Sequence, residues 1–162
     1  KLLAVRVDRV RLPQGREATR EIVEHAPAVA AVPLLPGGRV VLVQQWRHPA
    51  RQALLEIPAG VMHPDETPEE CVCRELAEEV GYRPQALHKL FSLYLAPGYS
   101  EEIIHIYLAE ELLPESLEPD EDEDLETVIM PLGEAVSLCQ EGKIQDAKSV
   151  AGLLATAQRG RR

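Results

Sequence analysis

Three glutamates, Glu75, Glu78 and Glu79, are spaced so that they would lie along one edge of an α-helix. Carboxylates at this spacing repel one another, so a solvated acidic face is the ordinary explanation. Two features favour a metal site instead: Arg74 is placed to brace Glu78, and a glycine-containing loop precedes the helix. Oxygen-only ligands are typical of hard cations. The segment therefore indicates a Mg²⁺ site, with Mn²⁺ as the alternative.

The ends of this helix are marked in the sequence. Thr67 and Glu70 have the spacing of a capping box, Pro68 occupies the first helical position, and Gly81 suits a left-handed stop. The pattern predicts a helix over residues 68–80. Its apolar residues cluster on the other side, so we expect that side to pack on a core and the glutamates to lie on an exposed face toward a cleft.

The rest of the chain reads as strands, then this helix, then strands, then two helices, which predicts an α+β fold. Residues 1–25 are expected to form a β-arm, with a bulge or break near Asp8, and residues 26–162 the main domain. The arm needs a partner for burial, either the main domain or a second subunit. We therefore expect a homodimer. The predicted strands span residues 1–12, 18–25, 28–35, 39–46, 54–57, 85–95, 102–109 and 125–130, and the two later helices 131–140 and 146–158.

Composition narrows the possible partners. The formal net charge of −10 argues against a nucleic-acid or anionic-membrane binder, and we expect neither partner. A dense acidic run at residues 118–124 is interpreted as a solvated loop. The three cysteines give no disulfide framework, and we expect them to be small apolar residues. No apolar run could span a bilayer and no signal-peptide pattern opens the sequence, so a cytoplasmic setting is expected.

The acidic segment also matches a known pattern. Gly60, Glu66 and residues 74–82 agree with every fixed position of the Nudix box, with aromatic Tyr82 at its last position. The chain thus resembles a Nudix hydrolase. The resemblance implies the Nudix fold, an α/β/α sandwich with a mixed central sheet flanked by helices, preceded here by the β-arm.

A narrower resemblance covers most of the chain. The matching segments are similar to the ADP-ribose pyrophosphatase branch, which cleaves the pyrophosphate of ADP-ribose to AMP and ribose 5-phosphate. A small nucleoside diphosphate is therefore the implied substrate. The segments are Arg20 and Glu21, residues 45–49, 56–60 and 96–102, the acidic run, and residues 142–148.

For the metal site, the resemblance implies that Glu75 and Glu79 bind the cation. The backbone carbonyl of Ala59 is a further ligand, and Glu78 binds directly or through water. Arg74 is implied to orient the glutamates.

For the chemistry, the resemblance implies a glutamate after a Pro-Gly pair as the base or water-orienting group. That position best matches Glu102, and Glu101 stays open as the alternative. Arg47 matches a position implicated in binding the substrate's phosphates.

The remaining substrate contacts come from the arm and two glycine loops. Arg20 and Glu21 match the arm region that helps to hold the nucleoside, sometimes from the other subunit. Gly60 and Gly98 are expected next to the substrate. For Tyr99, two roles stay open: contact with the substrate, or packing of a lid.

Some positions leave alternatives open. His63 and Asp65 depart from the branch, which commonly has an acidic residue and a glycine there; His63 is interpreted as a surface residue rather than a substrate contact. Trp46 is expected to pack in the core, with base stacking as the alternative. The other functions considered are hydrolysis of another nucleoside diphosphate derivative and an ADP-ribose sensor without catalysis.

Overall fold

The computed structural model describes residues 3–117 and 125–160, so the acidic run predicted to be a loop lies outside the described residues. No helix in these ranges is long and apolar enough to cross a membrane. The described part of the chain contains nine strands and three helices, in the order β1 (Ala4–Arg11), β2 (Glu17–Glu24), β3 (Ala28–Leu35), β4 (Arg39–Arg47), β5 (Gln52–Glu56), β6 (Ala59–Val61), α1 (Pro68–Glu79), β7 (Tyr82–Tyr94), β8 (Ile103–Pro114), β9 (Leu125–Pro131), α2 (Leu132–Gln140) and α3 (Ala147–Arg159).

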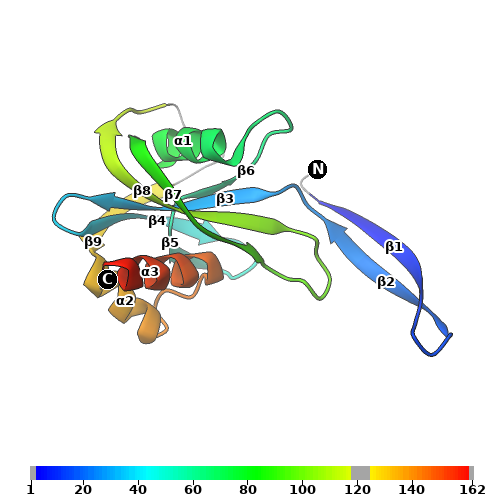
Figure 1. Ribbon diagram of the computed structural model, residues 1–162. Helices are drawn as coiled ribbons and strands as arrows, with labels where there is room; N and C mark the ends of the chain where they lie inside the picture. The colour runs from blue at the N-terminus through cyan, green and yellow to red at the C-terminus, as the bar shows by residue number, and fades with distance from the viewer. Residues whose placement is uncertain (1–2, 118–124, 161–162) are drawn as a thin grey trace.

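The main sheet is mixed and lies between two helical layers, as predicted. Its strand order is β5-β4-β3-β8-β7, with β6 added to β3 and β9 added to β4. Strands β3 and β8 run parallel, whereas the other paired strands run antiparallel. Helix α1 covers one face and helices α2 and α3 cover the other (Figure 1). The chain is therefore an α/β/α sandwich.

Alternating residues of β3 build a separate core on each face of the sheet. Ala28, Ala30 and Val32 face α2 and α3, whereas Val29 and Ala31 face α1. Strand β8 repeats this division, which follows from the period of two along a strand. Because both faces are covered, β3 reads as a continuous apolar run in the sequence, and β8 is apolar over most of its first half.

Strands β3 and β4 form a hairpin that soon divides. The two strands pair only at Leu34 with Val40 and at Leu35 with Arg39, after which β4 pairs with β5 and β9. Trp46, near the end of β4, pairs with Ala53 of β5. Trp46 is 59% exposed, and the prediction that it packs in the core is wrong.

Strands β1 and β2 form a two-stranded arm that projects from the body of the domain (Figure 1). Their register is continuous, and Asp8 pairs with Arg20, so the predicted bulge near Asp8 is absent. In the sequence, the apolar residues switch from one face of the strand to the other near Asp8, and this switch suggested a bulge. The pattern was misleading because the polarity of strand residues reports burial only where one face is covered. Here Val5 and Val7 are 67% and 61% exposed.

Candidate active site on helix α1

The capping signals fix where α1 begins and ends. Thr67 and Glu70 form the predicted capping box: the Glu70 carboxylate accepts from the Thr67 backbone N–H at 2.9 Å, and Thr67 Oγ1 accepts from the Glu70 N–H at 3.3 Å. Gly81 follows the helix with φ of 74°, a conformation that favours glycine. The helix thus ends at Glu79, one residue before the predicted end at residue 80.

Arg74 is the centre of the acidic helix edge. It donates from Nη1 to Glu75 at 2.7 Å and to Glu78 at 3.0 Å, so the expected bracing of Glu78 is confirmed. It also binds both oxygens of Glu66, at 2.9 Å and 3.0 Å. The hydrogen bonds that Arg74 donates lower the pKa of Glu66 from 4.5 to about 2, and the same bonds raise the pKa of Arg74. Glu66 therefore anchors the arginine that orients two predicted metal ligands.

Glu79 turns the other way, toward β6. Its Oε2 accepts a hydrogen bond from the backbone N–H of Ala59 at 3.1 Å. Glu75 and Glu79 are only 8% and 9% exposed, so the expectation of an exposed acidic face is wrong for these two residues. Strand β6 runs against α1 and covers this edge.

Gly60 is needed at this contact. A Cβ atom at position 60 would overlap the carboxylate of Glu75. The absence of a side chain therefore lets the β6 backbone and the helix edge approach closely, which explains a glycine between Ala59 and Val61.

The donor set on this edge suits Mg²⁺ or Mn²⁺, because Glu75, Glu78, Glu79 and the Ala59 carbonyl offer only oxygen. Across residues 3–117 and 125–160, no three His, Cys, Asp or Glu side chains are grouped as metal ligands. Arg74 holds two of the carboxylates and Ala59 the third. A cation would replace some of these hydrogen bonds.

The two candidate bases on the loop after β7 face different surroundings. Glu101 is 49% exposed on its side chain, and its carboxylate lies 3.6 Å from Arg6 of the arm. Glu102 is 22% exposed and lies beside His25. The backbone of Val23 hydrogen-bonds Tyr99 and Glu101, so the base of the arm and this loop are joined. Sequence reasoning had placed no role on His25.

The predicted substrate residues are distributed over three regions. Arg47 ends β4, where Nε and Nη2 each donate to Glu56 at 2.8 Å. Arg20 and Glu21 lie exposed on β2, along the projecting arm (Figure 1). Tyr99 is 61% exposed, in the turn that also contains Gly98. His63 is exposed, as expected for a surface residue.

One polar cluster beside Arg47 was not predicted. Buried Glu56 binds Arg47 and also Lys148, which starts α3. Both residues stand in segments that carry the narrower resemblance, so the signal was present. Their contact joins positions 92 apart, which periodicity and spacing do not reveal.

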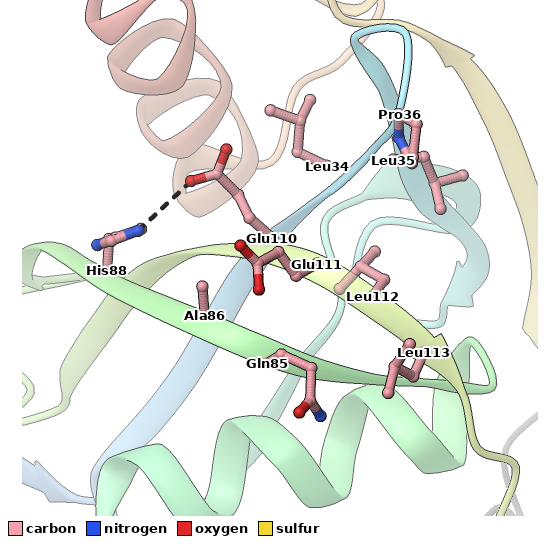
Figure 2. A pocket seen from close by; sticks show the side chains of 10 residues that line it. All are labelled: Leu34, Leu35, Pro36, Gln85, Ala86, His88, Glu110, Glu111, Leu112 and Leu113. Atoms are coloured by element: carbon pink, nitrogen blue, oxygen red, sulfur yellow. Dashed lines mark ion pairs between the residues drawn. The ribbon is translucent and has the colours of Figure 1, made fainter.

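A surface pocket of about 500 Å³ lies away from these residues. It is lined by the end of β3 and by parts of β7 and β8, and Figure 2 shows His88 and Glu110 facing each other across it at 3.5 Å. None of the predicted site residues lines it. A second pocket, of about 310 Å³, includes Arg74 on the outer side of α1. The candidate site is thus defined by the α1 edge rather than by the larger pocket.

Comparison with known proteins agrees with this geometry. Residues 24–153 match the NUDIX domain model. The chain is 40% identical over 151 residues to an ADP-ribose pyrophosphatase of Bacillus subtilis, with 92% of this chain and 82% of the relative covered. It is 37% identical over 152 residues to a methanol dehydrogenase activator of Bacillus methanolicus, covering 93% and 82%. A GDP-mannose pyrophosphatase of Yersinia enterocolitica is 39% identical over 124 residues, covering 71% and 64%.

A solved structure described as an ADP compounds hydrolase superposes with a TM-score of 0.84 at 26% identity, covering 99% of this chain and 96% of that chain. The chain belongs to the Nudix family. Within that family it is an enzyme, a pyrophosphohydrolase.

Proposed function

We propose that this enzyme hydrolyses the pyrophosphate bond of ADP-ribose, giving AMP and ribose 5-phosphate, with Mg²⁺ as cofactor. The observation that carries the proposal is that Arg74 hydrogen-bonds both Glu75 and Glu78, while Glu79 accepts from the Ala59 N–H. The chain that holds this arrangement is 40% identical to an ADP-ribose pyrophosphatase. Mn²⁺ is the alternative cation for the same oxygen ligands.

In this proposal the cation is held by Glu75, Glu79 and the Ala59 carbonyl, with Glu78 directly or through water. When bound, it supplies positive charge that offsets the pyrophosphate and activates water for attack. Arg74 keeps the carboxylates oriented. Because Glu66 holds Arg74 by two hydrogen bonds, the arginine remains on the helix edge whether or not the cation is bound.

Other residues bind the substrate and move the proton. Glu102 accepts or directs a proton of the attacking water, and its place beside His25 favours it over Glu101, which faces Arg6. Arg47 binds the phosphates through the N–H groups that Glu56 leaves available. Gly60, Gly98 and Tyr99 lie next to the bound molecule.

The arm is proposed to complete the site in a homodimer. Arg20 and Glu21 would hold the nucleoside from the arm, in the same subunit or its partner. The support is the exposed apolar row of Leu3, Val5 and Val7, which a second subunit would cover. The three free cysteines suit a reducing, cytoplasmic setting.

A different nucleoside diphosphate sugar is the second candidate. The observation that favours it is the identity of 39% to a GDP-mannose pyrophosphatase, together with His63 and Asp65, where the branch commonly has other residues. The metal site and base are unchanged in this alternative, and only the groups around the nucleoside and sugar differ.

A substrate panel separates the two candidates. The purified chain is assayed with Mg²⁺ against ADP-ribose, GDP-mannose, UDP-glucose and NADH, and kcat/KM is compared. We expect the highest kcat/KM for ADP-ribose. A higher value for another compound would overturn the choice of substrate while leaving the reaction class intact.

A further inference from the structure

Four charged side chains from three separate segments meet at the ends of β4 and β5 and the start of α3. Arg47 ends β4, Glu56 ends β5, and Asp146 and Lys148 stand at the start of α3. Arg47 binds both oxygens of Glu56, each at 2.8 Å. Nζ of Lys148 contacts Glu56 Oε2 and donates to Asp146 at 2.9 Å. We name these four residues the charged cluster.

Glu56 keeps its charge within this cluster although it is buried. Glu56 is 2% exposed and Lys148 is 7% exposed, whereas the Arg47 side chain is 42% exposed. Burial alone would raise the pKa of Glu56, but the hydrogen bonds from Arg47 and the charge of Lys148 outweigh burial and lower it. The hydrogen bond to Glu56 also raises the pKa of Arg47. Glu56 is therefore an anion held between two cations, one of them at the surface.

The backbone that follows Glu56 connects the charged cluster to the candidate metal ligands. The N–H of Ile57 donates to Ser149 Oγ at 2.8 Å, and Asp146 caps α3 by accepting from the Ser149 N–H at 2.9 Å. Two residues after Ile57, the N–H of Ala59 donates to Glu79. The Glu79 charge is also among the smaller causes that raise the pKa of Arg47.

We propose that Lys148 and Glu56 are positioning residues that hold Arg47 in the orientation in which it binds the substrate's phosphates. The inference rests on the proposed function, which gives Arg47 that role. A guanidinium has five N–H groups in a rigid fork, and Glu56 takes two of them. The others can donate to phosphate oxygens, which Arg binds through paired hydrogen bonds.

Lys148 is needed because Glu56 and Asp146 both contact it. Without Lys148, two carboxylates would stand close together in a largely buried place with Arg47 as the remaining cation. Arg47 would then turn inward to compensate for the second carboxylate and would lose its outward orientation. Loss of Lys148 should therefore weaken phosphate binding through Arg47.

The test is a double-mutant cycle of Arg47→Ala and Lys148→Met, read as the KM and kcat for the substrate with the highest kcat/KM. We expect each single substitution to raise KM by about tenfold with kcat changed much less, since charge-assisted hydrogen bonds to the substrate are lost. In the Arg47→Ala background, Lys148→Met should change KM less than about twofold. Lys148→Arg, which keeps the charge, should restore most of the affinity.

Two controls separate positioning from general damage. Lys143→Met removes a lysine of the same segment that is 66% exposed and paired with Glu141, and it should leave KM unchanged. Thermal melting checks folding, and Glu56→Gln replaces Lys148→Met in the cycle if the latter variant does not fold. If the charged cluster were purely structural, Lys148→Met would lower the melting temperature, and its effect on KM would be the same with and without Arg47.

The affinity of each variant for inorganic pyrophosphate with EDTA is measured in parallel, because this probe carries the phosphates without nucleoside or turnover. If ADP-ribose is not the substrate, the substrate panel will show it. The double-mutant cycle measured by pyrophosphate affinity should still show that the effect of Lys148→Met depends on Arg47. Equal effects of Lys148→Met with and without Arg47, or unchanged KM and affinity in Lys148→Met, would overturn the positioning role.

Discussion

Nδ1 of His25 lies 3.5 Å from Oε1 of Glu102, where the base of the arm meets the loop after β7. Their side chains are only 10% and 22% exposed. The neighbouring backbone is joined as well, because the Val23 N–H donates to the Tyr99 carbonyl at 2.7 Å. The proposed base is therefore held from the arm as well as from its own loop.

The first prediction separates Glu102 from Glu101. Glu102→Gln should lower kcat by about 100-fold or more with KM changed little, because a group that handles the proton of water acts in the chemical step. Glu101→Gln, which removes a pairing with Arg6 at the surface, should change kcat little. A larger loss of kcat in Glu101→Gln would exchange the two roles.

The second prediction concerns Gly60. An added Cβ would overlap the Glu75 carboxylate, which ends a flexible side chain, so Gly60→Ala should displace that carboxylate rather than unfold the domain. Calorimetry should show weaker Mg²⁺ binding, and kcat should fall by about tenfold or more. Gly133→Ala is the matched control, because a Cβ there meets no atom within 4 Å. Unchanged Mg²⁺ affinity in Gly60→Ala would remove Glu75 from the metal site.

The third prediction is a pH dependence of stability. The folded-state pKa of Glu66 is about 2, below its ordinary 4.5, so its stabilisation is fully present above about 4.5 and is lost as the pH falls toward 2. Glu66→Gln should reduce the free energy of unfolding at neutral pH by on the order of 1 kcal/mol and flatten its decline below pH 4.5. Urea unfolding across this range measures both. Glu17→Gln, which removes an exposed ion pair with Arg11 on the arm, is the control. An equal decline of the free energy of unfolding below pH 4.5 in Glu66→Gln and in the unaltered chain would contradict the prediction.

The fourth prediction tests the homodimer. Val5 and Val7 are more than half exposed on the arm, so burying them against a second subunit would favour association. Light scattering should give the mass of a dimer for the unaltered chain and of a monomer for Val5→Asp combined with Val7→Asp. A monomer mass for the unaltered chain at micromolar concentration would refute the dimer.

Local chemistry made the central helix predictable. Thr67, Pro68 and Glu70 specify its start within four residues, and Gly81 supplies the positive φ after it, so few alternatives remained. The nearly continuous apolar run of β3 likewise predicted a strand, and both faces of that strand are covered.

The remaining features depend on contacts between distant segments. Trp46 follows a buried strand in sequence, but it lies exposed near the end of β4, where it pairs with the distant strand β5. Burial of Glu75 and Glu79 depends on the approach of β6, and the adjacent Glu101 and Glu102 face different residues, Arg6 and His25. The pairing of Glu56 with Lys148 joins β5 to α3, which no local pattern specifies.

The measurement that tests the account most directly is the Mg²⁺ dependence of ADP-ribose hydrolysis, with the products identified by chromatography. The unaltered chain should give AMP and ribose 5-phosphate in equal amounts, lose activity in EDTA and regain it with excess Mg²⁺. Glu79→Gln should retain the fold and lose turnover. Binding of ADP-ribose without hydrolysis at saturating Mg²⁺, or full activity in Glu79→Gln, would contradict the account.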